Sequence, residues 1–411
     1  MDQVDLSPRL AQRFQVAQRA DVPPFHVMDM IARAAERQRT HGDAISLMMG
    51  QPSTGAPRAV TEEAVRLLQS GAPLGYTQAT GILELRRAIA GHHRAWHGID
   101  VDPEEVVVTT GASGGFLATF LAAFDAGDKV GMARPTYACY RNVLVALGCE
   151  VVEIPTGPAT RFQPTVEQVA ALHEQVGLKG LVLASPANPT GTMLLPAELA
   201  ALAAYCEQAG IWLVSDEIYH GITYDTPASE DPVGARSLRG RSAWETSREA
   251  VVFGSFSKYF SMTGWRIGWM LVPERLRRAV DVLVGNFTIC PPVLAQYAAV
   301  QAFTPQAYAE LDGHVARYAA NRRLLLDGLR DLGVTELAPA DGAFYVYADV
   351  SRWTDDTMAW SHRLLDATGV AVAPGIDFDT ADGHRYVRLS FAGSGDDIAL
   401  ALDRLSGFLT S

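Results

Sequence analysis

A short segment beyond the middle of the chain combines a lysine with residue types that bind phosphate. The segment SFSKYFSMTGWRIGW (255–269) follows an apolar run and contains Ser255, Ser257, Lys258 and Arg266. A lysine amine can form an imine with an aldehyde cofactor, which then serves as an electron sink. Such a cofactor, if it carries a phosphate, needs hydroxyl donors and a bidentate cation, which Ser255 and Arg266 would supply. An isolated lysine after a strand would be a solvated surface residue, but this combination predicts a covalent cofactor site at Lys258.

A glycine-rich turn offers a second place for a phosphate. The segment TTGASGGF (109–116) lies between an apolar run and an apolar helical pattern, and Gly111, Ala112 and Ser113 would expose free backbone N–H groups there. Free N–H groups and the helix dipole attract anions. Taken alone, the segment would be interpreted as an ordinary strand-to-helix turn. Its spacing is not the GxGxxG of a dinucleotide site.

The lysine segment resembles the lysine motif of the class I and II aminotransferases, which form fold type I of the pyridoxal-phosphate enzymes. The shared pattern is S-x-S-K-x(5)-G-x-R, and it is highly specific. Further segments match the family in the same order from about residue 45 to residue 393, nearly the whole chain. The resemblance implies that pyridoxal 5'-phosphate is the cofactor and that Lys258 both holds it and moves the substrate proton.

The same resemblance implies roles for three residues around the cofactor ring. Asp216, in SDEIYHG (215–221), would face the pyridine nitrogen and keep it protonated. Tyr219 would donate to the phenolic oxygen and lower the pKa of the imine. Asn188, in SPANPTGT (185–192), would reach both that oxygen and the substrate carboxylate. Without the resemblance, Asp216 would be interpreted as a helix cap and the Asn-Pro-Thr-Gly sequence as a tight turn.

Two tyrosine segments also match the family. ARPTYACYRN (133–142) would place an aromatic ring on the cofactor face, and Tyr137 fits best, with Tyr140 as the second choice and a core tyrosine as the alternative. LGYTQATGILELRRAIA (74–90) matches the segment whose tyrosine reaches the phosphate of the neighbouring subunit. Tyr76 would therefore act in trans, in a homodimer with shared active sites.

The substrate side is implied by two further matches. Arg388, in YVRLSFAG (386–393), would bind the α-carboxylate through its planar fork, and the backbone N–H of Gly50, in LMMGQPSTGAP (47–57), would lie near it. Ser113 stands where some relatives carry lysine, and NFTICPP (286–292) has no cation, which favours a neutral aliphatic side chain. Within the family, the sequence resembles the actinobacterial valine–pyruvate and aspartate aminotransferase-like members.

The resemblance thus implies a ping-pong aminotransferase. It would move the amino group of an L-amino acid of the valine or alanine type to a 2-oxo acid such as pyruvate or 2-oxoglutarate. An aspartate-type aminotransferase and a β-eliminating carbon–sulfur lyase stay open as alternatives, because their shared residues would look almost the same. A transcription regulator with an aminotransferase-like domain would need a basic winged-helix segment, and only about 45 non-basic residues precede the first motif.

These residues must be positioned by an α/β architecture. From about residue 60 to 290, helical patterns alternate with apolar runs at 105–111, 129–135, 180–189, 211–217 and 250–258, which predicts a parallel sheet with crossover helices. Four of the five runs carry a candidate polar residue just past the carboxyl end, where ligands of such sheets bind. The resemblance implies a mostly parallel seven-stranded sheet between helices, and a smaller α+β domain.

The expected domain boundaries follow from where these patterns change. Residues 51–295 would form the large cofactor-binding domain and 296–411 the C-terminal small domain, which includes GAFYVYADV (342–350) and a helix near 358–368. Residues 1–50 would form an N-terminal arm and part of the small domain, because PPFHVMDMIARAAERQRTHGD predicts an extended arm followed by an amphipathic helix.

Composition limits the partners. The formal net charge of the 411 residues is −12, which disfavours nucleic acid and anionic membranes as partners. The four cysteines contain no CxxC pair, so no metal site or disulfide framework is expected. The start MDQVDLSPRLAQRF is polar and no run of about 18 apolar residues occurs, so we expect a cytoplasmic protein without a membrane span.

Overall fold

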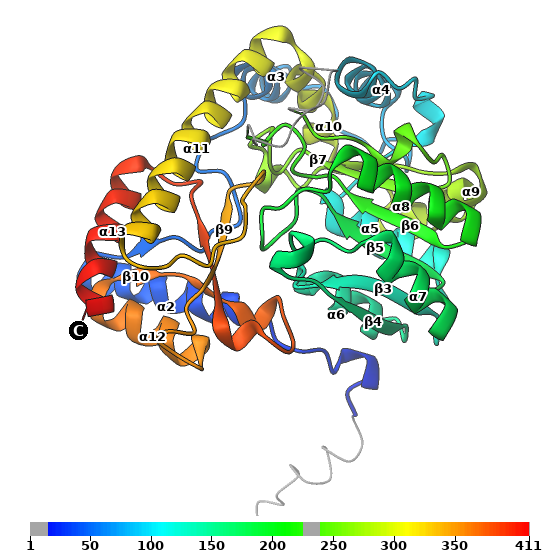
Figure 1. The fold of residues 1–411 in the computed structure, drawn as a ribbon. Coiled ribbons are helices and arrows are strands. Elements are labelled where there is room, and N and C mark those ends of the chain that lie inside the picture. The colour runs from blue at the N-terminus through cyan, green and yellow to red at the C-terminus, as the bar shows by residue number, and fades with distance from the viewer. Residues whose placement is uncertain (1–14, 225–238, 411) are drawn as a thin grey trace, which may run out of the picture.

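A computed structural model describes residues 15–224 and 239–410, and its largest element is a sheet of seven strands (Figure 1). β8 runs antiparallel to its neighbours β2 and β7, and the other pairs of neighbours are parallel. The mostly parallel seven-stranded sheet expected from the resemblance is therefore confirmed. In spatial order the strands are β2 (Val106–Thr109), β8 (Gly268–Leu271), β7 (Val251–Ser255), β6 (Trp212–Asp216), β5 (Gly180–Ala184), β3 (Lys129–Arg134) and β4 (Glu150–Pro155).

Both faces of the sheet are covered by helices, which explains why its central strands are apolar without alternation. In β2, Val106 and Val108 face one core while Val107 faces the other. The first core includes side chains of α4 (Leu83–His97), α7 (Val166–Val176) and α8 (Pro196–Ala209). The second core includes side chains of α5 (Gly111–Ala123), α6 (Ala138–Ala146) and α9 (Glu274–Thr288).

Two of the seven strands were not among the apolar runs recognised in the sequence. β4 pairs only with β3 at the edge of the sheet, and its mixed burial, with Glu150 and Glu153 in the strand, interrupts the apolar pattern. β8 has four residues and begins at Gly268, inside the lysine segment. Short and edge strands carry weak periodic signals, so only the pairing in the folded chain identifies them.

A second group of elements is built from the C-terminal part of the chain. Its strands form the antiparallel sheet β11 (Ala373–Pro374), β12 (Tyr386–Ser390) and β9 (Tyr345–Asp349). Its helices are α12 (Thr357–Thr368) and α13 (Gly395–Thr410), and the long helix α11 (Pro305–Asp331) packs on α13. Near the other end of α11, α3 (Arg58–Gln69) packs against α10 (Val293–Ala299).

The predicted amphipathic helix near the N-terminus is α2 (His26–His41), and it lies beside this C-terminal group (Figure 1). Its first N–H groups, those of His26 and Val27, donate to the carboxylate of Asp377 at 2.9 and 2.7 Å. The helix ends at Gly42, which adopts the left-handed conformation that glycine tolerates. Residues 1–14, where the N-terminal arm was also expected, lie outside the described residues.

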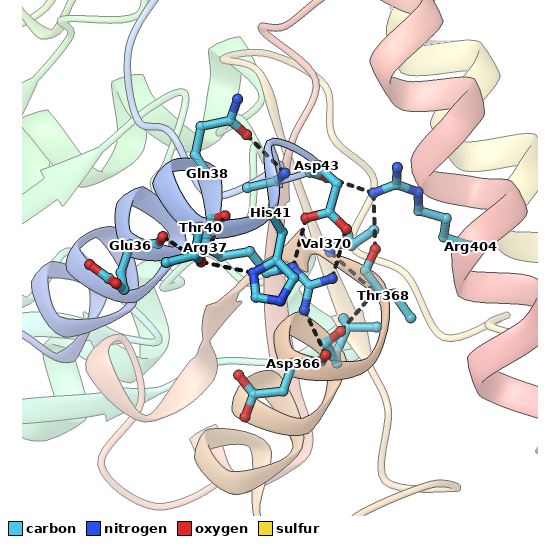
Figure 2. Close-up of polar contacts among 12 residues, drawn as sticks. Glu36, Arg37, Gln38, Thr40, His41, Asp43, Asp366, Thr368, Val370 and Arg404 are labelled. Atoms are coloured by element: carbon cyan, nitrogen blue, oxygen red, sulfur yellow. Dashed lines mark hydrogen bonds and ion pairs between the residues drawn. The ribbon is translucent and has the colours of Figure 1, made fainter.

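Polar contacts fix the end of α2 to the C-terminal helices, as Figure 2 shows. Arg37 pairs with Asp43 at 2.7 Å and donates to the backbone oxygen of Asp366 at 2.6 Å. Arg404 donates to the backbone oxygens of Asp43 and Thr368 at 2.7 and 2.9 Å. The adjoining strand β1 (Ile45–Ser46) pairs in parallel with β10 (Val370–Ala371). The chain just before Gly50 is therefore held by the C-terminal elements.

Across the described ranges, the helices are too short or too polar to cross a membrane.

Candidate active site

Lys258 lies three residues after the end of β7, at the carboxyl end of the central sheet. Its Nζ donates to the backbone oxygen of Gly50 at 2.6 Å and lies 5.4 Å from the centre of the Tyr219 ring. Burial lowers the pKa of Lys258 to about 8, and the nearby charge of Arg388 acts in the same direction. About a tenth of the amine is therefore neutral, and hence nucleophilic, at pH 7.

Asp216, the last residue of β6, is buried at the same edge of the sheet. The hydroxyl of Tyr140 donates a short hydrogen bond to its Oδ2, and the N–H of Ile218 donates to its Oδ1 at 3.1 Å. Burial raises the pKa of Asp216 to about 6, although both hydrogen bonds favour the charged form. A cation placed against this carboxylate would be strongly attracted, as a protonated ring nitrogen would be.

Arg388 on β12 brings the C-terminal sheet to the site. Its side chain is buried, and it donates to Oδ1 of Asn188 and to the backbone oxygen of Met48, both at 2.7 Å. The guanidinium lies over two rings, with its Cζ 4.5 Å from the centre of Tyr345 and 4.8 Å from that of Phe378. The structure thus joins Asn188 and Arg388, which are 200 residues apart. A planar fork held in this way suits a carboxylate.

Tyr219 completes the group around Lys258. Its side chain is buried, and its hydroxyl forms a hydrogen bond of 2.8 Å with the hydroxyl of Tyr345 on β9. Gly50 lies against the same hydroxyl, because a Cβ atom on Gly50 would be 3.1 Å from Oη of Tyr345 and 4.0 Å from Nη2 of Arg388. The structure therefore places the predicted residues Lys258, Tyr219, Gly50 and Arg388 next to one another.

The predicted phosphate cradle is also brought together. Gly111 begins α5 with a φ of 68°, and a Cβ atom there would lie 2.5 Å from Nη2 of Arg266, so the guanidinium rests directly on the glycine. Arg266 is exposed, and its Nη1 donates to the backbone oxygen of Thr263 at 3.1 Å. Ala112 is buried and Ser113 is exposed beside it. A cation and free helix N–H groups side by side form a site that suits a phosphate.

Ser255 and Ser257, two of the three serines of the lysine segment, are buried. Oγ of Ser255 accepts a hydrogen bond of 3.0 Å from the N–H of Ser257. The backbone oxygen of Ser257 accepts a bond of 2.7 Å from the hydroxyl of Thr263. These bonds turn the chain sharply after β7, so that Lys258 and Arg266 both lie at the end of the sheet.

Aromatic side chains border the site on the side of α6. Tyr137 precedes α6, is half-buried, and meets Tyr140 edge to face with ring centres 5.5 Å apart. Tyr140 is buried, so Tyr137 has the more accessible ring of the two. Phe25 contacts Tyr137 edge to face at 6.1 Å, and Asn142 donates to the backbone oxygen of Pro23 at 3.2 Å. The segment before α2 therefore reaches the site.

Tyr76 is not brought into the site of its own chain. Its side chain is 82% exposed.

An open cavity lies between the loop that follows Gly50 and the loop that follows Lys258. Its walls include Thr54 and Ser261, whose hydroxyls form a hydrogen bond of 2.9 Å.

Several residues of the site were missed in the sequence. They are Tyr345, Phe378 and the Met48 carbonyl, which all contact Arg388. Tyr140 was considered only for covering the cofactor, and its contact with Asp216 was not predicted. One signal for Tyr345 was present, because GAFYVYADV alternates as a strand. β12 pairs with β9 so that Arg388 lies opposite Tyr347. Tyr345, two residues before Tyr347, is therefore a diagonal neighbour of Arg388. That register was not deduced from the sequence.

A cluster of histidines lies behind the site, around a small enclosed cavity between α4 and the sheet. Burial lowers the pKa of His92, His93 and His220 well below the usual value, and that of His97 to about 4. Glu217 lies 3.5 Å from Nδ1 of His220, and burial raises its pKa to about 8. These groups are therefore held mainly in their neutral forms near neutral pH.

Comparisons with known proteins agree with this geometry. Residues 42–405 match the family model for aminotransferase class I and II. The valine–pyruvate aminotransferase of Mycobacterium tuberculosis is 60% identical over 97% of this chain and 99% of its own. The aspartate/prephenate aminotransferase of Thermus thermophilus is 37% identical over 94% of this chain and 96% of its own. A crystal structure of an aminotransferase from Mycobacterium tuberculosis covers 97% of this chain and 99% of its own, with a TM-score of 0.92 and 59% identity.

Proposed function

Because the chain belongs to the class I and II aminotransferases, we propose that it transfers the amino group of a neutral aliphatic L-amino acid to a 2-oxo acid with pyridoxal 5'-phosphate as its cofactor. The observation that carries the proposal is the half-buried Lys258, whose pKa is lowered to about 8 beside Asp216, Tyr219 and Arg388. That amine, that carboxylate and that guanidinium are the groups which the cofactor and an amino acid substrate require.

The residues fit the cofactor. Gly111, Ala112, Ser113 and Arg266 would hold its phosphate, with Ser255 and Ser257 shaping the turn below. Asp216 would hold the proton on the ring nitrogen, Tyr137 would cover one face of the ring, and Tyr219 and Asn188 would donate to its phenolic oxygen. When bound, pyridoxal phosphate supplies an electron sink for the electron pair released at the α-carbon of the substrate.

The other steps belong to side chains of this protein. Arg388 and Asn188 would bind the α-carboxylate together with the N–H of Gly50, and so orient the α-carbon toward Lys258. Nζ of Lys258 would take the α-proton as a general base and return it as a general acid. Two half-reactions of this kind, one on an amino acid and one on a 2-oxo acid, make up a ping-pong reaction.

An amino donor of the valine or alanine type and pyruvate as acceptor, with 2-oxoglutarate as a further acceptor, are supported by three observations. The relative from Mycobacterium tuberculosis at 60% identity is named a valine–pyruvate aminotransferase. The position in the glycine-rich turn where some family members carry lysine is Ser113. The apolar ring of Phe25 borders the site beside Tyr137. An apolar wall favours an uncharged substrate side chain over a carboxylate.

The test is a rapid-mixing screen in which the cofactor-loaded protein meets single amino acids. Valine and alanine are expected to shift the cofactor absorbance to that of the amine form at least tenfold faster than aspartate and glutamate. Faster reaction with aspartate would favour the aspartate type, as in the relative from Thermus thermophilus. Release of pyruvate and ammonia from a cysteine-type substrate without any 2-oxo acid would reveal a lyase. Lys258→Arg should fold and retain the cofactor noncovalently while losing nearly all turnover.

We further propose that the protein is a homodimer in which Tyr76 completes the partner's phosphate site. The proposal is supported by apolar side chains that are exposed on α5 and α9, two helices that pack together. They are Leu117, Leu121, Val282 and Phe287, which are 38%, 37%, 41% and 56% exposed. Large apolar side chains exposed on two neighbouring helices are typical of an interface.

Mixing two inactive variants tests the shared site. Lys258→Ala and Tyr76→Ala each lack one component, but a hybrid dimer would contain one site with both residues intact. Activity is expected to return after the two variants are mixed and allowed to exchange subunits. No recovery, with exchange verified by mass spectrometry, would show that Tyr76 does not act in trans.

A further inference from the structure

Tyr345 lies where the residues assigned to the cofactor meet those assigned to the substrate. It is fully buried at the start of β9, and its hydroxyl forms the 2.8 Å hydrogen bond with Tyr219. The same hydroxyl approaches Gly50, whose backbone oxygen accepts the hydrogen bond from Lys258. The hydroxyl of Tyr345 therefore contacts both neighbours of the lysine amine.

The ring of Tyr345 has a separate contact. The guanidinium of Arg388 lies 4.5 Å from its centre, and Phe378 covers the guanidinium at 4.8 Å. Because a guanidinium is attracted to aromatic faces, the two rings hold Arg388 flat and restrict its rotation. The outward Nη atoms are then aimed at Asn188 and at the backbone oxygen of Met48.

We propose that Tyr345 is a positioning residue that links the two halves of the active site, with its hydroxyl orienting Tyr219 and its ring orienting Arg388. The inference rests on the proposed roles of Lys258, Tyr219 and Arg388. A phenol has a single hydroxyl proton. When Tyr219 donates that proton to a bound cofactor, its oxygen can only accept from Tyr345, and such an accepted bond strengthens the bond that Tyr219 donates.

The first test concerns the hydroxyl alone. Tyr345→Phe keeps the ring and removes the bond to Tyr219, which weakens donation by Tyr219 to the phenolic oxygen of the cofactor. Less stabilisation of that oxygen favours the protonated form of the lysine-bound cofactor. The pH midpoint of its absorbance change is therefore expected to rise by about 0.3 to 1 unit. An unchanged midpoint would overturn the role of the hydroxyl.

Tyr347→Phe is the matched control. Tyr347 lies two residues further along β9, is equally buried, and stacks on Tyr386 with ring centres 4.6 Å apart. Within the described residues its hydroxyl has no hydrogen-bond partner. The Tyr347→Phe substitution therefore removes a buried hydroxyl from the same strand but leaves the hydrogen bond between Tyr219 and Tyr345 intact. The absorbance midpoint should then equal that of the wild type, and an equal shift in both variants would mean a general effect of packing.

The second test concerns the ring. The probe is 3-methylbutanoate, which has the carboxylate and side chain of valine but no amino group to react. Tyr345→Phe should bind it within about twofold of the wild type, because the aromatic face beneath Arg388 remains. Tyr345→Leu should bind it about threefold to thirtyfold more weakly, which corresponds to the loss of one cation–π contact. Equal affinity of the two variants would overturn the role of the ring.

The proposed function can be judged separately from this inference. Wild-type protein should show the absorbance band of the lysine-bound cofactor, and Lys258→Ala should lack it. If the wild type shows no such band, the proposed function fails before Tyr345 is tested. If the band is present and the Tyr345 variants behave as the wild type does, only the inference about Tyr345 fails.

Discussion

Replacing Arg388 by lysine should lower kcat/KM for valine by about tenfold to 150-fold. The substitution keeps the positive charge but removes the planar fork, so one of two parallel hydrogen bonds to the substrate carboxylate is lost. A hydrogen bond to a charged group contributes about 1.5 to 3 kcal/mol, and each 1.36 kcal/mol corresponds to tenfold in rate. Both Nη atoms of Arg388 donate at 2.7 Å in the structure, Nη1 to Asn188 and Nη2 to the backbone oxygen of Met48, and each has a second N–H group with which it would bind the carboxylate.

The sharpest assay compares valine with 2-methylpropan-1-amine, which is valine without its carboxylate. The half-reaction of each amine with cofactor-loaded protein is followed by absorbance. In the wild type, valine should react much faster than the amine. In Arg388→Lys, the valine rate should fall while the rate of the amine stays the same, since the amine never uses Arg388. Circular dichroism and the cofactor absorbance serve as checks that the variant is folded and loaded.

Two results would refute this reasoning. If both compounds slow down equally, Arg388 acts by supporting the site as a whole, for example through its contact with Asn188. If neither slows down, the carboxylate is bound elsewhere. A KM that rises while kcat stays constant would instead mean that Arg388 binds the ground state and the transition state equally well.

Three further outcomes are expected. The rate at which the cofactor-free protein binds the cofactor should rise with pH and reach half its maximum near pH 8, because burial lowers the pKa of Lys258 to about 8 and only the neutral amine attacks. Stopped-flow absorbance measures this rate, and an inflection near pH 10 would contradict the prediction. Tyr140→Phe removes a hydrogen-bond donor that favours the charged form of Asp216, so the pKa of Asp216, now about 6, should rise. The affinity for the cofactor should fall by about tenfold, and more at pH 6 than at pH 8. Titration of the cofactor measures this affinity, and an unchanged value would contradict the prediction. Burial lowers the pKa of His97 in the folded state to about 4, so as the pH falls below about 6.5 the unfolded chain is protonated before the folded one and stability is lost. For this group the loss in the free energy of unfolding is about 2 kcal/mol at pH 5. Urea unfolding should show a smaller loss in His97→Gln.

Much of the site followed from local sequence. Lys258 and Arg266 lie in one short segment, and Asp216 ends an apolar strand, so their types and spacing could be read without the fold. The sheet rule also explains why separate segments meet, because the carboxyl ends of β5, β6 and β7 lie at one edge. Asn188, Asp216 and Lys258 are therefore neighbours, although 70 positions separate the first from the last.

Other features could not be read in this way. Tyr345 was not singled out in the sequence, and only the docking of β9 and β12 beside the central sheet gave it contacts with Tyr219 and Arg388. Tyr140 was a second choice for covering the cofactor, but the turn into α6 brings its hydroxyl to Asp216. The edge strand β4 was missed because its apolar pattern is interrupted.

The sequence by itself determined which chemical groups this protein offers and which segments carry them, because side-chain identity, turn residues and apolar runs are properties of neighbouring positions. Only the tertiary structure decided their electrostatic state and mutual orientation. The pKa of Lys258 falls because distant elements bury it and bring Arg388 close, and Arg388 contacts the rings of Tyr345 and Phe378, which come from separate segments. Burial and distance depend on how the whole chain packs, so no local pattern encodes them.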